Sequence, residues 1–106
     1  NTLAIFVTHF QGFNGLSEKL LKKIKRKKII LIEDVCESHG AKHKGKKLGT
    51  FGLMSNFSFY YAHHMSTIEG GMICTDSKKI YEQARIFRSH GMAREAKNFK
   101  FEKKND

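Results

Sequence analysis

Short apolar runs alternate with a helical repeat of apolar positions along the first third of the chain. Residues 3–7 form a short apolar run, which is typical of a buried strand. Ser17 stands where its hydroxyl can cap a helix whose apolar face carries Leu20 and Ile24, with lysines on the other face. Residues 29–32 form a second apolar run. A strand, a helix and a strand within about 30 residues predict a βαβ unit with parallel strands.

The middle of the chain predicts turns and two further strands. Residues 35–41 are predicted as a short helical turn. Residues 42–52 carry three glycines among lysines and are predicted as an exposed hairpin or loop. Residues 57–60 and 72–75 are predicted as strands.

The last predicted element is a helix. Asp76 or Ser77 caps its start, Ile80 and Phe87 share one face, and Gly91 stands where a left-handed residue can end it. The chain after residue 94 has no periodicity, so no structure is predicted there. No run of 18 apolar residues occurs, so no membrane partner is expected. The elements predict an α/β fold with a mainly parallel sheet and flanking helices.

Basic residues exceed acidic residues, and the formal net charge is +10 over 106 residues. The surplus is concentrated in residues 22–28 and 42–47, and such a surplus attracts anions, including nucleic acids. Blocks of like charge usually form a solvated surface, and no aromatic residues alternate with these lysines. No nucleic-acid partner is expected, and a basic nucleic-acid-binding module is only a remote alternative. Cys36 and Cys74 form no disulfide framework, which predicts a cytoplasmic protein.

Polar residues accompany the ends of two predicted strands. In open α/β sheets, ligands bind beyond the carboxyl ends of the parallel strands. Asp34 stands at such an end. Its carboxylate either binds a ligand or has a structural role, as a helix cap or as the partner in a salt bridge. Ser58 lies in a second such strand, residues 57–60, and the pair His63-His64 follows that strand. Neighbouring histidines tend to point in different directions, so no metal site is predicted.

Six short motifs follow one another in a fixed order. They are Glu33-Asp34-Val35-Cys36-Glu37-Ser38-His39-Gly40-Ala41, Lys44-Gly45-Lys46, Gly49-Thr50-Phe51-Gly52, Phe57-Ser58-Phe59-Tyr60, Glu69-Gly70-Gly71-Met72 and Arg88-Ser89-His90-Gly91. With these motifs the chain resembles the sugar aminotransferase and dehydratase family of pyridoxal-phosphate enzymes, built on the aspartate-aminotransferase fold. Members are several times longer. The resemblance therefore implies that residues 1–106 are a central part of the large cofactor-binding domain of a fold-type I enzyme.

The resemblance implies cofactor-binding roles for three residues. Asp34 matches the aspartate that pairs with the pyridine nitrogen of the cofactor, which makes the ring an electron sink. Ser58 matches a residue that binds the cofactor phosphate. Glu37 falls near the ring hydroxyl of the cofactor, where many aminotransferases of the family have glutamine. The dehydratase branch of the family shares this departure.

His63 is the departure from the family pattern that decides the implied activity. In the aminotransferases the matching residue is the lysine that holds the cofactor covalently. Imidazole cannot form that bond, so pyridoxal 5'-phosphate or pyridoxamine 5'-phosphate is expected to bind noncovalently, with His63 as the catalytic acid and base. Residues 60–71 are similar to the branch that removes the 3-hydroxyl from nucleotide-linked 4-keto-6-deoxyhexoses. The implied activity is this 3-dehydration, in the biosynthesis of deoxysugars and surface polysaccharides.

The resemblance also implies partners and leaves alternatives. The partners are a nucleotide-linked 4-keto-6-deoxy sugar, an amino donor such as glutamate, and a second subunit in a homodimer. The alternatives are a nucleotide-sugar aminotransferase without its lysine and a catalytically inactive homologue.

An iron–sulfur cluster is used by a second dehydratase branch, and Cys36 falls where that branch has its first ligand. Because this chain has no cysteine after Cys74, no iron–sulfur cluster is expected. His90 and Arg94 are candidates to face the substrate or the amino donor. For His90 the alternative is that it caps a helix.

Overall fold

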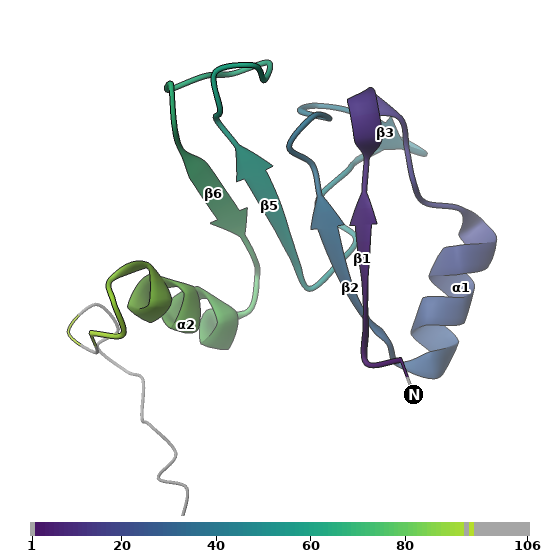
Figure 1. Ribbon diagram of the computed structural model, residues 1–106. Helices are drawn as coiled ribbons and strands as arrows, with labels where there is room; N and C mark the ends of the chain where they lie inside the picture. Colours follow the sequence, from purple (N-terminus) through teal and green to yellow (C-terminus); the bar gives the residue numbers. More distant parts are fainter. Residues whose placement is uncertain (1, 93, 95–106) are drawn as a thin grey trace, which may run out of the picture. The chain divides into compact units, whose positions relative to one another are not determined.

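The computed structural model describes residues 2–92 and 94 and divides the chain into two compact units, Asn1–Cys74 and Thr75–Asp106. No boundary within the chain was expected from the sequence. The first unit contains a sheet, a helix and a hairpin, and the described residues of the second form the helix α2 (Figure 1). All residues predicted to bind the cofactor or act in catalysis lie in the first unit.

A four-stranded sheet forms the centre of the first unit. Its strand order is β1-β2-β5-β6, where β1, β2 and β5 run parallel and β6 runs antiparallel to β5 (Figure 1). The bounds are Ala4–Thr8 for β1, Ile30–Asp34 for β2, Met54–Ser58 for β5 and Gly71–Cys74 for β6. The predicted mainly parallel sheet is therefore confirmed.

Helix α1 (Glu18–Lys27) links β1 to β2 and confirms the predicted βαβ unit. The Ser17 hydroxyl caps it by accepting a hydrogen bond from the backbone N–H of Leu20 over 3.2 Å. Ile24 is buried in a core that α1 shares with the sheet. The buried members of this core are Leu16, Ile24, Leu31, Val35 and Leu48.

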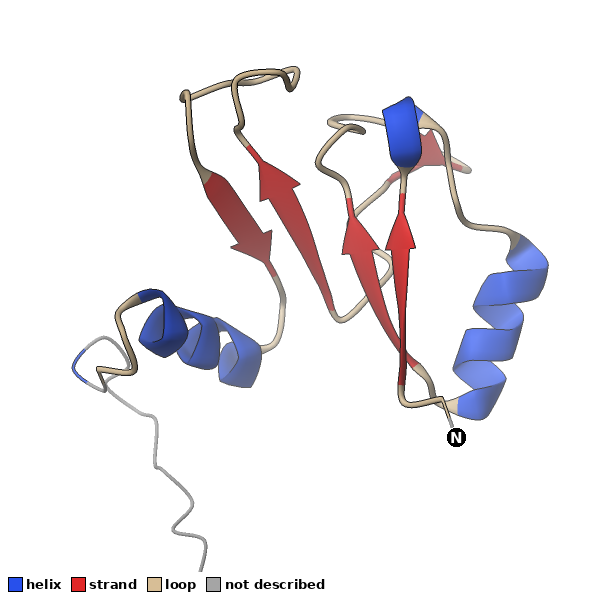
Figure 2. Ribbon diagram, viewed as in Figure 1, coloured by secondary structure: helices blue, strands red, loops and turns tan. Residues whose placement is uncertain are grey.

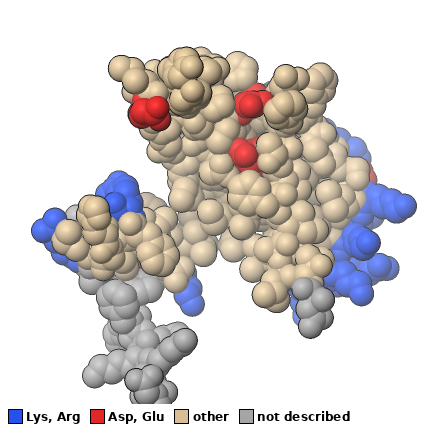
Figure 3. Space-filling model, in the orientation of Figure 1, with Lys and Arg blue, Asp and Glu red and all other residues tan. Residues whose placement is uncertain are grey.

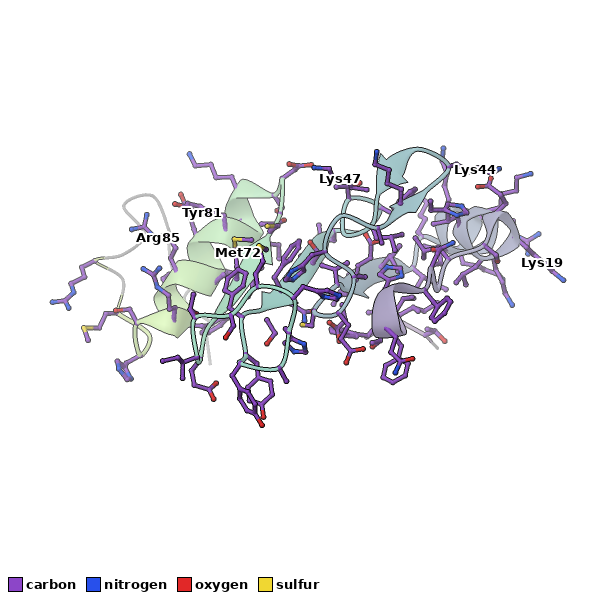
Figure 4. The ribbon with its side chains drawn as sticks, turned by 90° about the horizontal axis from the view of Figure 1, so that it is seen from above. Lys19, Lys44, Lys47, Met72, Tyr81 and Arg85 are labelled. Carbon is purple, nitrogen blue, oxygen red and sulfur yellow. The ribbon has the colours of Figure 1, made fainter. Side chains whose placement is uncertain are left out.

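The lysines of α1 lie on its exposed side, as the pattern of like charges predicted. Figure 3 shows Lys and Arg side chains gathered over this helix. Lys19 points away from the sheet, while Lys44 and Lys47 lie on the hairpin (Figure 4). The basic side chains therefore lie on α1 and on the hairpin that follows β2.

The segment predicted as a hairpin or loop is a hairpin made of β3 (Lys42–His43) and β4 (Lys46–Lys47). Its two-residue turn places Lys44 and Gly45 at φ 49° and 80°, the left-handed conformation that two-residue hairpin turns require at both positions. Glu18 of α1 accepts hydrogen bonds from His43 Nε2 and Lys44 Nζ over 3.1 and 3.2 Å. These contacts join the hairpin to the start of α1.

Two predictions for the middle of the chain differ from the structure. Residues 35–41 form successive turns rather than a helical turn, with hydrogen bonds from Ser38 N to Val35 O and from Ala41 N to Ser38 O. Strand β5 begins at Met54 rather than residue 57, because it pairs with β2 from Met54 onward. Ser55 and Asn56 interrupt the apolar pattern, so a search for apolar runs does not find the start of this strand.

The second unit contains α2 (Lys78–Arg88), which Ser77 caps as predicted. His90, at φ 55°, is the first left-handed residue after the helix, and the N–H of Gly91 donates to Ile86 O. The capping role considered for His90 thus belongs to its backbone. Phe87, predicted on the apolar face of this helix, is 77% exposed, and Glu82 and Ile86 are the buried residues. Within the described residues, no helix has the length and apolar character needed to cross a membrane.

Candidate functional site

The carboxyl ends of the three parallel strands meet at one edge of the sheet. Figure 2 shows the loops that follow β1, β2 and β5 at this edge. Thr8, Asp34 and Asn56 are register partners across the three strands, so their side chains lie in one row on one face of the sheet. Leu31 and Glu33 point to the opposite, α1-covered face and are buried. Glu33 and Asp34, which are adjacent at the end of β2, therefore lie on opposite faces of the sheet.

Asp34 lies within a hydrogen-bond network of neutral donors. Its Oδ1 accepts from the backbone N–H of Cys36 and from Asn56 Nδ2, both over 3.1 Å. Its Oδ2 accepts a longer hydrogen bond of 3.4 Å from the Thr8 hydroxyl. Partial burial raises the pKa of Asp34, but hydrogen bonds from Cys36, Asn56 and Thr8 outweigh it and hold that pKa below the ordinary value. Asp34 is therefore ionised at neutral pH, with Oδ2 still able to accept another donor.

Glu33 and His9 form a fully buried pair that holds the loops of this edge in place. Glu33 accepts from His9 Nε2 over 3.2 Å and from the backbone N–H groups of Gly49, Phe51 and Gly52 over 2.7–2.8 Å. His9 Nδ1 accepts from the N–H of Gly15, so its proton is on Nε2. Four donors fill the acceptor positions of the carboxylate.

The segment at Gly52 passes close to β2, as the short hydrogen bond to Glu33 requires. A Cβ atom at Gly52 would lie 2.5 Å from the backbone oxygen of Leu31. Only glycine allows this approach, which brings the N–H of residue 52 to the Glu33 carboxylate.

A hollow of about 560 Å³ opens at the same edge, over the loops that follow β1, β2 and β5. Its wall contains two of the predicted site residues, Glu37 and His63. Glu37 Oε2 accepts a hydrogen bond of 2.8 Å from the backbone N–H of Gln11, in the short 3-10 turn η1 (Phe10–Gly12). The lining residues are Gln11, Glu37, Tyr60, Ala62, His63 and His64.

His63 is placed by a turn that follows β5. Ser58 is the last residue of β5, and its Oγ accepts from the N–H of Tyr60 over 3.2 Å. The N–H of His63 donates to Tyr60 O over 3.0 Å, and the ring of His63 meets the Tyr60 ring edge-on at 5.7 Å. The Ser58 hydroxyl keeps its own proton for another acceptor. Ser58 and Asp34 lie at neighbouring strand ends and are not part of the wall of the hollow.

His39 lies close to the pair His63-His64. Its ring is 5.5 Å from the Phe57 ring and 5.9 Å from the His64 ring. Both ring nitrogens are buried without a hydrogen-bond partner among the described residues. Burial, with His64 and His63 nearby, lowers the pKa of His39, so this ring is neutral at neutral pH.

Cys36 is a free thiol enclosed by Asp34 and Asn56. Burial and the Asp34 carboxylate raise its pKa to about 11, so little thiolate is present at neutral pH. Within the described part of the chain, no three His, Cys, Asp or Glu side chains are grouped to hold a metal ion.

We expect Cys36 to react slowly with iodoacetamide at neutral pH. In a Cys74→Ser variant of the full-length protein that retains no other cysteine, the alkylation rate should keep rising with pH up to about 11, because only the thiolate reacts. Mass spectrometry of the Cys36 peptide gives the rate at each pH. A rate that levels off below pH 9 would contradict the described surroundings of the thiol.

The chain is similar to a family of known proteins. Residues 1–105 match the DegT/DnrJ/EryC1/StrS aminotransferase family. The chain belongs to this family.

Relatives within this family include both dehydratases and aminotransferases. The GDP-4-keto-6-deoxy-D-mannose 3-dehydratase of Escherichia coli O55:H7 is 44% identical over 94 residues, which cover 89% of this chain and 24% of that enzyme. A GDP-4-keto-6-deoxymannose-3-dehydratase crystallised with a trapped PLP-glutamate geminal diamine has a TM-score of 0.80 and 38% identity, over 96% of this chain and 28% of that chain. A Helicobacter pylori aminotransferase involved in the biosynthesis of pseudoaminic acid has a TM-score of 0.78 and 32% identity. The match covers 84% of this chain and 24% of that chain.

The predicted aminotransferase fold is thereby confirmed for this member of the DegT/DnrJ/EryC1/StrS family. The chain spans about a quarter of the length of these relatives. Roles of single residues are therefore argued from the geometry of this chain.

Three residues of this site were not found from the sequence. Gln11 and Tyr60 line the hollow, and Asn56 contacts Asp34. Side chains alternate along a strand, so Asn56, two residues before Ser58, could have been placed on the same face. Gln11 carries no sequence signal of this kind, because its contact with Glu37 joins loops 26 positions apart.

Proposed function

We propose that the full-length protein catalyses a pyridoxal-phosphate-dependent 3-dehydration of a nucleotide-linked 4-keto-6-deoxyhexose. In this proposal, residues 1–106 are a central part of its large cofactor-binding domain. The observation that carries the proposal is the hollow beyond the strand ends, whose only basic side chains among the described lining residues are His63 and His64. A lysine that could hold the cofactor covalently is not among them.

The described residues fit the cofactor by their chemistry. Asp34 is an ionised carboxylate whose Oδ2 can accept a further hydrogen bond, such as one from the N–H of a pyridine ring. Ser58 has a hydroxyl proton to donate to a phosphate oxygen, and Glu37 lies in the wall of the hollow. When bound, the pyridoxamine form of the cofactor supplies an amine for the C4 ketone and a ring that accepts electrons.

His63 moves protons in the proposed reaction. Its imidazole takes a proton from carbon as a base and, as an acid, gives a proton to the departing C3 hydroxyl, which leaves as water. The turn after Ser58 fixes the backbone of His63, and Tyr60 packs on its ring. Imidazole is suited to both transfers because one ring nitrogen can accept a proton while the other can donate one.

The proposed partners follow from the same chemistry. Glutamate is proposed as the amino donor that restores the amine form, in line with the PLP-glutamate geminal diamine trapped in the related 3-dehydratase. A homodimer and a cytoplasmic location are also proposed. Two free thiols suit a reducing compartment.

The proposal is tested with the full-length protein, pyridoxal phosphate, glutamate and a GDP-linked 4-keto-6-deoxyhexose. Mass spectrometry of the sugar should show a product that has lost one oxygen relative to the substrate. A product with an amine in place of the ketone would instead identify an aminotransferase working without lysine, the activity that the Helicobacter pylori relative favours. No product, with intact cofactor binding, would indicate an inactive homologue.

A further inference from the structure

Asn56 joins the carboxylate of Asp34 to the thiol of Cys36. Asp34 and Asn56 are register partners in neighbouring parallel strands. The side-chain nitrogen of Asn56 donates to Asp34 Oδ1 over 3.1 Å and to Cys36 Sγ over 3.2 Å. An amide NH₂ group has two hydrogens, so these two contacts use both.

Charge decides which way the Asn56 amide points. The reversed orientation would set the amide oxygen against the Asp34 carboxylate, which repels it. In the orientation described, Asn56 Oδ1 is buried without a hydrogen-bond partner among the described residues. A buried oxygen without a partner costs free energy, so this orientation depends on the two hydrogen bonds that the amide nitrogen donates.

The consequence of this contact is an asymmetric carboxylate. The Asn56 amide and the backbone N–H of Cys36 both donate to Oδ1, whereas Oδ2 accepts a longer hydrogen bond of 3.4 Å from the Thr8 hydroxyl. The carboxylate cannot rotate without breaking two hydrogen bonds to Oδ1. Oδ2 is thus the oxygen presented to a further donor.

We propose that Asn56 is a positioning residue, which fixes Asp34 so that Oδ2 receives the pyridine N–H of the cofactor. This inference rests on the proposed function, because it takes the cofactor to bind at Asp34. Asn56 acts through Asp34 and does not touch the cofactor. Its loss should weaken only that part of cofactor binding that depends on the ring nitrogen.

The test compares two ligands in the full-length protein. One is pyridoxal 5'-phosphate, and the other is its 1-deaza analogue, in which C–H replaces the ring nitrogen. Dissociation constants are measured by calorimetry for the wild type, Asn56→Leu, Asn56→Ala and Ser55→Ala. Ser55 is the matched control, because it is buried on the same strand but its hydroxyl has no hydrogen-bond partner among the described residues.

The wild type and Ser55→Ala should bind pyridoxal phosphate on the order of tenfold more tightly than the analogue, as expected for a charge-assisted hydrogen bond. In both Asn56 variants this preference should fall to about threefold or less, with the affinity for the analogue unchanged. A full preference in both variants would overturn the inference, and so would an equal loss of affinity for both ligands, which is the mark of a purely structural role. A wild type without any preference, or without binding, would instead overturn the proposed function at Asp34.

Discussion

Replacement of His63 by asparagine is expected to lower the rate of 3-dehydration by about a thousandfold or more in the full-length protein. General acid–base catalysis by a positioned side chain typically contributes about 10²–10⁴-fold, and His63 is proposed to perform two proton transfers. Asparagine keeps a polar side chain of similar size but cannot exchange a proton near neutral pH. Single-turnover formation of the deoxygenated sugar, followed by mass spectrometry, measures the effect.

Cofactor binding should survive this change. Asp34 and Ser58, which are proposed to hold the ring nitrogen and the phosphate, lie at strand ends outside the turn that carries His63. The dissociation constant of pyridoxal phosphate should therefore change by less than about threefold, well under the tenfold that corresponds to 1.4 kcal/mol.

His43→Asn is the matched control, because His43 is a histidine of the hairpin that contacts Asn14 and Glu18. Its activity should stay close to that of the wild type. Full activity of His63→Asn would remove His63 from the mechanism.

Replacement of Glu33 by glutamine is expected to destabilise the fold by about 3–5 kcal/mol, the range for breaking a buried charged network. The carboxylate accepts four hydrogen bonds, from His9 and from three backbone N–H groups. Glutamine has one acceptor oxygen, and its NH₂ group would face N–H donors that then have no acceptor. In thermal unfolding of the full-length protein, the midpoint should fall by on the order of 10 °C.

Glu18→Gln serves as the control for the loss of one negative charge. Glu18 also contacts a histidine, but its side chain is 48% exposed, so water replaces the lost contacts. Its unfolding midpoint should stay near that of the wild type. Equal midpoints for Glu33→Gln and Glu18→Gln would show that the buried network contributes little.

The site chemistry depends on the same network. Glu33 holds the segment around Gly49–Gly52, and its partner His9 begins the loop that carries Gln11 into the hollow. We therefore expect Glu33→Gln to weaken cofactor binding as well as the fold. This second effect distinguishes a residue that supports the site from one in a remote part of the core.

The family, the parallel βαβ unit and the N-caps of both long helices could be read from the sequence. These features are local or follow from order along the chain: the Ser17 cap needs only the next few residues, and two apolar runs around an amphipathic segment fix the direction of β1 and β2. His63 was likewise predicted from its place along the chain, between motifs that resemble those of the family.

Contacts between strand ends were decided only by the tertiary structure. Strand β5 begins three residues earlier than its apolar run because pairing with β2 compensates for the polar side chains of Ser55 and Asn56. The opposite surroundings of Glu33 and Asp34 depend on which face α1 covers. The contact between Asn56 and Asp34 joins residues 22 positions apart, and no local pattern records such a contact. Local rules thus determined the elements and their order, whereas hydrogen-bond partners across the sheet were set by register and burial.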